Sequence, residues 1–273
     1  MKKPCIAFIG MLLCATIGAN ENEFNRITFD KESGRLTTEA ALRHYAQAAP
    51  GGELHVFTPH LSLGYSMGSH GFGARLPLTF ALYTGDSEAI NSFSYGFEDA
   101  QLSYDYSIRR GALNFFLGGF WSLPIKAPGD ETEGSPVSPG SGRHGLGLSF
   151  SAHGIRDPVV WNLGFSYGVG LPSSESDSGI WEPGNIGLSA GITVLFNEVF
   201  GFRLNLHQQL RLPQAGGADA ASFSASSSFS PEALVMGDDW HLRLRLDIYA
   251  HPLFAPTALG ITYGYMFDLP ARR

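Results

Sequence analysis

The stretch 240–249, WHLRLRLDIY, alternates apolar and polar residues along its whole length. Because successive side chains of a β-strand point to opposite faces, this pattern predicts a strand with one apolar and one polar face. Its polar face carries arginine and histidine, whereas a soluble surface would carry much more lysine and glutamate. The same alternation occurs at 101–109, 186–196 and 202–212. Together these stretches predict an all-β protein.

The predicted strands are long enough to cross a bilayer, which takes about 9–11 residues, whereas strands of soluble proteins average about 5–6. The connections between them alternate between short and long, as in bacterial outer-membrane barrels. The short connections lie near 110–111, 154–157, 197–198 and 237–238, and the long ones near 84–97, 125–141 and 172–183. We expect strands at 53–66, 71–83, 98–109, 112–124, 142–154, 158–171, 184–196, 200–212, 220–235, 238–250 and 256–267. The sequence therefore predicts an antiparallel transmembrane β-barrel.

An even number of strands requires one more, since single-chain bacterial barrels have even strand counts. If the short turns face the periplasm, this strand must precede 53–66, and we place it at 25–35, which gives twelve strands. The next segment, 37–49 (TTEAALRHYAQAA), is interpreted as a short helix, because a threonine start, Glu39 in the first turn and the PGG at 50–52 are typical helix boundaries. Such a helix would either plug the barrel mouth or lie along its rim.

The N-terminus has the features of a secretory signal peptide at 1–19: Lys2 and Lys3, then an apolar run at 6–17 that is too short to span a bilayer as a helix. A lipoprotein signal through Cys14 fits less well, because Leu13 stands where a small residue is preferred. Both cysteines lie within this signal. We expect three parts: the signal peptide at 1–19, an N-terminal segment at 20–52, and a β-barrel at 53–273. The expected location is the bacterial outer membrane.

Composition excludes several classes of protein. Charged residues make up 16% of the chain, against about 25% in soluble domains, while glycine reaches 34 residues and aromatics 12%. This profile argues against a disordered chain and against a coiled coil. The net charge of −7 and the lack of a basic cluster argue against nucleic-acid binding.

The C-terminal strand ends in alternating aromatic residues, Tyr263, Tyr265 and Phe267, followed by six more residues. Such endings are common in substrates of the barrel assembly machinery, which we expect as a partner. The four tryptophans fall near predicted strand ends, as interfacial girdles require, so we also expect contact with outer-membrane lipid and lipopolysaccharide. The acidic long loops are interpreted as solvated charge, with binding of divalent ions as the alternative.

One predicted wall of the lumen is basic. Arg203, His207 and Arg211 share the inner face of one strand, and His241, Arg243 and Arg245 share that of the strand two away, with serines at 222, 224, 226 and 228 between them. Charged rings inside a pore set ion selectivity, so this wall would favour anionic solutes. The alternative is that these arginines pair with inward acids such as Asp105 and Asp247 and brace a filled lumen.

No motif supports enzymatic, metal or cofactor chemistry. Outer-membrane lipid hydrolases need a lipid-facing serine and histidine near the outer rim, whereas strand parity places His60, His153, His207 and His241 inside the barrel. The histidines lack HxH or HExxH spacing, and the PGSGRHG stretch at 139–145 lacks the Gly-Lys-Ser/Thr of a phosphate loop. We therefore expect no enzyme, no metal and no cofactor.

Several stretches resemble a family of outer-membrane proteins named for the meta-pathway of phenol degradation. They are GFEDAQLSYDYSI (96–108), FFLGGFWSLPIKAPGDETEG (115–134), SPGSGRHGLGLSFSA (138–152) and WNLGFSYGVG (161–170). The resemblance covers about residues 55–267 and implies an outer-membrane barrel that serves as a channel for small, including aromatic, compounds. The interpretation is thus a narrow passive channel. A non-conducting structural or interaction protein is the alternative, and a rim lipid hydrolase is less favoured.

Overall fold

The computed structural model describes residues 34–49, 52–85, 92–125, 144–171, 184–212, 224–250 and 257–268, and within these ranges all regular structure is β-strand. No helix in them is long and apolar enough to cross a membrane. The strand segments are β1 (Arg35–Ala49), β2 (Gly52–Met67), β3 (His70–Gly85), β4 (Ser92–Phe97), β5 (Ala100–Arg110), β6 (Leu113–Leu123), β7 (Gly145–Arg156), β8 (Val159–Gly170), β9 (Asn185–Leu195), β10 (Phe200–Arg211), β11 (Ser224–Met236), β12 (Trp240–Tyr249) and β13 (Thr257–Asp268).

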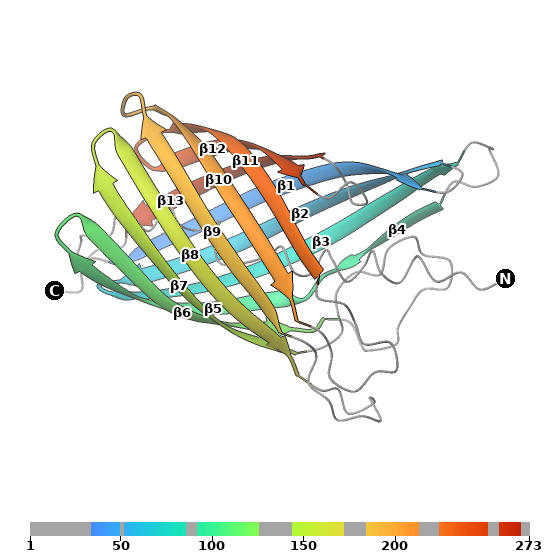
Figure 1. The fold of residues 1–273 in the computed structure, drawn as a ribbon, viewed down its shortest axis with the longest axis horizontal. Helices are drawn as coiled ribbons and strands as arrows, with labels where there is room; N and C mark the ends of the chain where they lie inside the picture. Colours follow the sequence, from blue (N-terminus) through green and yellow to red (C-terminus); the bar gives the residue numbers. More distant parts are fainter. Residues whose placement is uncertain are drawn as a thin grey trace.

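The sheet closes on itself. Neighbouring strands pair antiparallel around the ring, and β1 pairs with both β2 and β13 (Figure 1). Segments β4 and β5 both pair with β3, so they form one strand interrupted at Glu98 and Asp99. Pro77 of β3 lies opposite this interruption, where its carbonyl accepts a hydrogen bond of 3.1 Å from the Glu98 backbone N–H. A bulge is where a strand tolerates a proline, which has no N–H of its own to donate. The result is a closed barrel of twelve strands, as predicted.

The predicted helix at 37–49 is wrong, because these residues form most of β1. Helix propensity is overridden here because an unpaired strand edge cannot be left in a membrane: without β1, both β2 and β13 would lack a partner. In the barrel Ala41 pairs with His60 on one side and Thr262 on the other. Because residues 37–49 form no helix, they cannot act as a helical plug of the barrel mouth or as a helix along its rim. The strand expected at 25–35 and the signal peptide at 1–19 lie outside the described residues, except for Gly34 and Arg35.

The two ends of the barrel differ. Short turns join β2 to β3, β5 to β6, β7 to β8, β9 to β10 and β11 to β12, and the last residues of β13 lie at this same end (Figure 1). Gly68 and Gly111 adopt φ values of 57° and 61° in two of these turns, a conformation that tight hairpins require and that glycine adopts readily. Short turns are periplasmic in outer-membrane barrels, so we refer to this end as periplasmic and to the other as outer.

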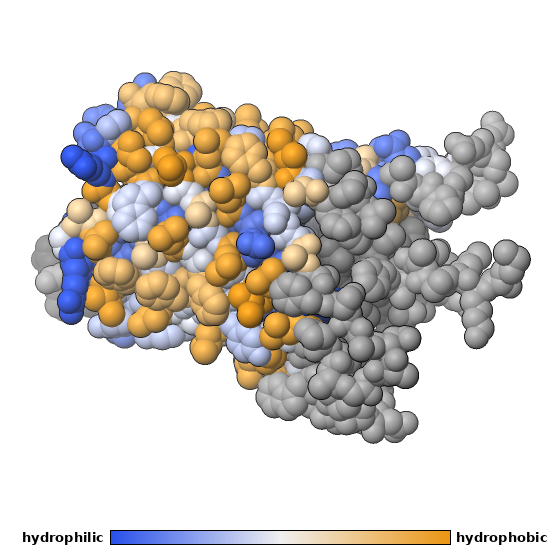
Figure 2. Space-filling model, in the orientation of Figure 1, coloured by the Kyte–Doolittle hydropathy of each residue, from blue (hydrophilic) through white to orange (hydrophobic). Residues whose placement is uncertain are grey.

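The outer face of the barrel is apolar and the inner face polar. Alternate residues along the strands point outward and leave large apolar side chains exposed, among them Leu148 (67%), Leu206 (58%) and Leu259 (59%). Figure 2 shows apolar side chains over most of the described part of the visible face, with strongly hydrophilic residues at the short-turn end. Exposed leucines on this scale would be unfavourable in water, whereas lipid chains cover them at no cost.

Candidate solute pathway in the barrel lumen

The structure places all of the predicted lumen residues on the inner face. Arg203, His207 and Arg211 share the inward side of β10, and register pairs them with inward residues of β9 and β11. The inward side of β12 carries His241, Arg243, Arg245 and Asp247. Strand β11 lies between these two strands with Ser226, Ser228 and Ser230 inward, whereas Asp105 lies on β5, across the barrel. Ser222 lies outside the described residues. The wall therefore extends over three neighbouring strands, with the arginines on β10 and β12 and the buried Glu232 of β11 in register between Arg203 and Arg245.

Glu39 of β1 anchors the periplasmic half of this wall. Its carboxylate accepts a hydrogen bond of 3.0 Å from Arg243 Nη2 and lies 3.3 Å from His241 Nε2. All three side chains are almost fully buried. A buried ion pair contributes little net stability but becomes costly when one partner is lost, so this contact ties β1 to β12 across β13.

Asp247 organises a second cluster on the same wall. Its carboxylate lies 3.0 Å from Arg43 Nη2 and 2.6 Å from Arg245 Nε, and Ser230 Oγ donates to it at 2.5 Å. Arg43 also donates to the hydroxyl of Tyr249. Two guanidinium groups and a hydroxyl therefore compensate one buried carboxylate, and the site remains locally basic.

Polar side chains fill the periplasmic half of the lumen beside β7–β12. Arg203 Nε donates to Thr193 Oγ1 at 2.9 Å, and both side chains are buried. Asn162 and Asn205 approach each other over Gly191, where an added Cβ would lie 2.4 Å and 2.2 Å from their Oδ1 atoms. His153 of β7 is 1% exposed and contacts Ser151 Oγ at 3.2 Å. This side of the lumen is closed at its periplasmic end.

The opposite wall has its own ionic group nearer the outer end. Arg75 Nη2 lies 3.1 Å from His60 Nδ1, and Thr79 Oγ1 donates to the carboxylate of Glu98 at the bulge. Above this group an apolar cluster fills the lumen side of β1–β3 and β13. The cluster consists of Tyr45, Leu54, Val56, Ala81 and Ala258, with Tyr83 and Tyr249 packed against it.

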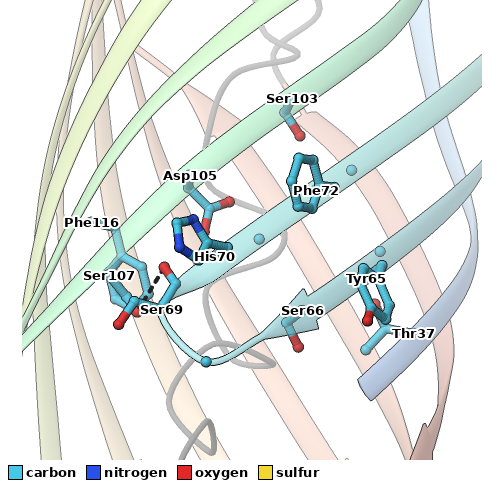
Figure 3. Close-up of a pocket in the computed structure, with 14 residues that line it drawn as sticks. Thr37, Tyr65, Ser66, Ser69, His70, Phe72, Ser103, Asp105, Ser107 and Phe116 are labelled. Carbon is cyan, nitrogen blue, oxygen red and sulfur yellow. Dashed lines mark hydrogen bonds between the residues drawn. The ribbon is translucent and has the colours of Figure 1, made fainter. Parts of the chain in front are cut away.

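A pocket opens on the periplasmic half of this second wall (Figure 3). Ser103, Asp105 and Ser107 of β5 line it together with Thr37, Ser66 and Phe116. The pocket depends on glycines, which leave room for the neighbouring polar side chains. An added Cβ on Gly71 would lie 2.6 Å from Asp105 Oδ2, and one on Gly64 would lie 2.3 Å from Thr37 Oγ1. The lining is therefore hydroxyl-rich, with one carboxylate.

The sequence interpretation missed the residues that complete these clusters. Glu39 and Arg43 were assigned to a helix, although the alternation of Glu39, Ala41, Arg43 and Tyr45 with Ala40, Leu42 and His44 is a strand pattern that could have identified them. Glu98 carries no such signal, because the bulge shifts the parity of its strand. Among the described residues, no group of three or more His, Cys, Asp and Glu side chains is placed to hold a metal ion.

The closed barrel with an apolar outer belt and a polar lumen defines the class of transmembrane β-barrels. No protein-family model matches the chain, and no curated protein sequence matches it. Among solved structures, the COG4313 outer membrane channel from Pseudomonas putida F1 superposes with a TM-score of 0.68 at 14% identity, over 87% of this chain and 97% of that one.

Two further structures share the fold. The TodX ΔS2S3 mutant, a monoaromatic hydrocarbon channel, gives a TM-score of 0.51 at 11% identity, over 92% of this chain and 95% of that one. The NanC porin gives 0.50 at 12% identity, over 86% of this chain and 100% of that one. At these identities the likeness establishes the fold, and these neighbours are channels by name rather than enzymes.

Proposed function

We propose that this chain is a narrow passive channel of the bacterial outer membrane for small solutes, with a preference for anions, aromatic anions included. The observation that carries the proposal is the outer half of the lumen beside β7–β11. Its inward side chains are mostly glycine and serine and are partly exposed, and the basic groups among them are Arg211 and His207. Within the described parts of these strands, this half has no inward carboxylate. A basic, small-residue wall of this kind favours anions over cations.

Three observations support aromatic solutes. Phe120 of β6 points inward and its ring lies over Gly147, where an added Cβ would be 2.0 Å from the ring. The neighbour TodX is named as a monoaromatic hydrocarbon channel, and the sequence resembles the phenol meta-pathway family. Aromatic side chains on a lumen wall offer ring faces to an aromatic solute.

The test is conductance of the refolded protein in a planar bilayer under a salt gradient. We expect discrete steps and a reversal potential that shows anion preference, with benzoate reducing the chloride current. Arg211→Gln should reduce the preference, because it removes a charge from the accessible wall. Arg156→Gln is the control, since that exposed side chain points outward at a periplasmic turn. Folded but silent protein would refute the channel and favour a structural or interaction role.

The partner assignments stay predictions. Tyr263, Tyr265 and Phe267 point outward on β13, the strand that closes the barrel against β1. Recognition of this strand by the barrel assembly machinery, and contact of the apolar belt with lipopolysaccharide, are inferred from these side chains.

A further inference from the structure

We infer that the accessible route through the lumen is diagonal: it enters beside β7–β11 at the outer end, crosses along β5 and β6, and leaves through the hydroxyl-lined pocket beside β2–β5 at the periplasmic end. The inference deepens the proposed channel function and rests on it.

The wall formed by β7–β11 is accessible only in its outer half. On β7, inward Ser149 is partly exposed, whereas Ser151, two residues nearer the periplasm on the same face, is buried. On β11, inward Ser228 is partly exposed, whereas Ser230 is 0% exposed. The change from accessible to buried also occurs on the strands between them, where the buried part begins at Asn162, Gly191 and Asn205. A solute that enters along this wall therefore cannot continue straight down it.

The wall formed by β2–β5 shows the reverse order. Its outer half is closed: inward Leu54, Val56 and Ala81 are 3%, 0% and 0% exposed, and Glu98 is buried at the bulge. Its periplasmic half is partly exposed at Ser103 and Ser107, which line the pocket of Figure 3. Solvent therefore reaches this wall at the end opposite to that at which it reaches β7–β11.

Strands β5 and β6 join the two accessible regions. Their inward residues Gln101, Ser103, Gly118 and Phe120 are all partly exposed, so the accessible surface is continuous between the outer opening and the pocket. Gly118 leaves this part of the wall without a side chain: an added Cβ would lie 2.6 Å from Ser149 Oγ and 3.5 Å from Asp105 Cβ, which are its partners on the two neighbouring strands.

Thiol accessibility tests the route independently of conductance. Single cysteines are introduced into protein whose Cys5 and Cys14 are serine, and modification by the anionic reagent 2-sulfonatoethyl methanethiosulfonate is followed as a gain in intact mass. Serine to cysteine is nearly isosteric, and heat-modifiable gel mobility verifies folding. Ser149→Cys is compared with Ser151→Cys, and Ser228→Cys with Ser230→Cys. Ser103→Cys and Ser107→Cys probe the exit, and the outward Ser227→Cys is the lipid-facing control.

We expect the exit positions and the outer member of each pair to react at least about tenfold faster than Ser151→Cys and Ser230→Cys, whose exposure requires local opening. Modification at Ser103→Cys should also lower single-channel conductance. Equal rates within the pairs would overturn the diagonal in favour of a straight central pore, and protection at Ser103 and Ser107 would show a closed vestibule. The labelling does not depend on ion conduction. A protein that labels with the expected pattern but shows no conductance would therefore refute the channel function, while the water-filled route through the lumen would stand.

Discussion

Replacing Glu39 with alanine tests whether β1 is anchored through the lumen. The change removes the acceptor of the 3.0 Å contact from Arg243 and the neighbour of His241, and it leaves a guanidinium group that is 5% exposed. Losing one partner of a buried ion pair costs about 3–5 kcal/mol, because the remaining charge stays desolvated. We therefore expect Glu39→Ala to lower the free energy of unfolding by about 3–5 kcal/mol.

The assay is equilibrium urea unfolding in phosphatidylcholine vesicles, followed by tryptophan fluorescence and extrapolated linearly to zero urea. The control is Asp268→Ala, which removes an ion pair between the same strand, β1, and β13. In this pair Arg35 Nε lies 2.9 Å from the carboxylate of Asp268, whose side chain is 45% exposed. Because an exposed ion pair contributes little, Asp268→Ala should lower the free energy of unfolding by only about 0–1 kcal/mol.

A double-mutant cycle separates the ion pair from other effects of the substitution. The double variant Glu39→Ala, Arg243→Ala leaves no guanidinium group without its carboxylate. Its loss of stability should therefore be about 1–3 kcal/mol smaller than the sum of the losses of the two single variants. Strict additivity, or a loss for Glu39→Ala as small as that of Asp268→Ala, would refute the anchoring role.

Two further changes test the assignment of faces and the packing of the lumen. Leu206→Arg places a charge at the middle of the outward face of β10 and should lower the free energy of unfolding by about 2–4 kcal/mol. Phe200→Arg, at the end of the same face, should lower it by only about 0–1 kcal/mol. Equal losses in the same urea assay would contradict the position of β10 in the bilayer. Gly191→Ala should lower the free energy of unfolding by about 1–3 kcal/mol, because the added methyl group collides with the amides of Asn162 and Asn205. Gly119→Ala is the control and should leave the free energy of unfolding nearly unchanged, since its Cβ makes only ordinary contacts, from 3.4 Å. No loss of stability in Gly191→Ala would show that the two amides move apart freely.

The sequence predicted the fold class and most of the strands because both depend on local pattern. The alternation in WHLRLRLDIY assigns each residue of β12 to a face without knowledge of its neighbours. The even-number rule required a twelfth strand, but the sequence analysis placed it at 25–35, whereas β1 is Arg35–Ala49. The inward positions of Arg203, His207, Arg211, Arg243 and Arg245 followed from the same parity. Their roles in selectivity remain predictions.

The helix prediction at 37–49 failed for a reason that lies outside the segment. An alanine-rich stretch with Glu39 near its start satisfies local helix rules, and only the need of β2 and β13 for a partner makes it a strand. Sequence reasoning treated Asp105 and Asp247 alike as partners for the arginines. The fold places Asp247 between Arg43 and Arg245, and Asp105 across the barrel in the pocket.

The sequence by itself determined that this is a transmembrane barrel with a basic inner wall, because alternation and strand length are properties of single segments. Only the tertiary structure decided which charges meet, since Glu39 and Arg243 are brought together by barrel closure across more than 200 positions of the chain. It also decided which inward residues remain accessible. Ser149 and Ser151 are equivalent in sequence and parity, but Ser151 lies in the buried part of the lumen, where His153 contacts its hydroxyl and Phe116 of β6 lies beside it.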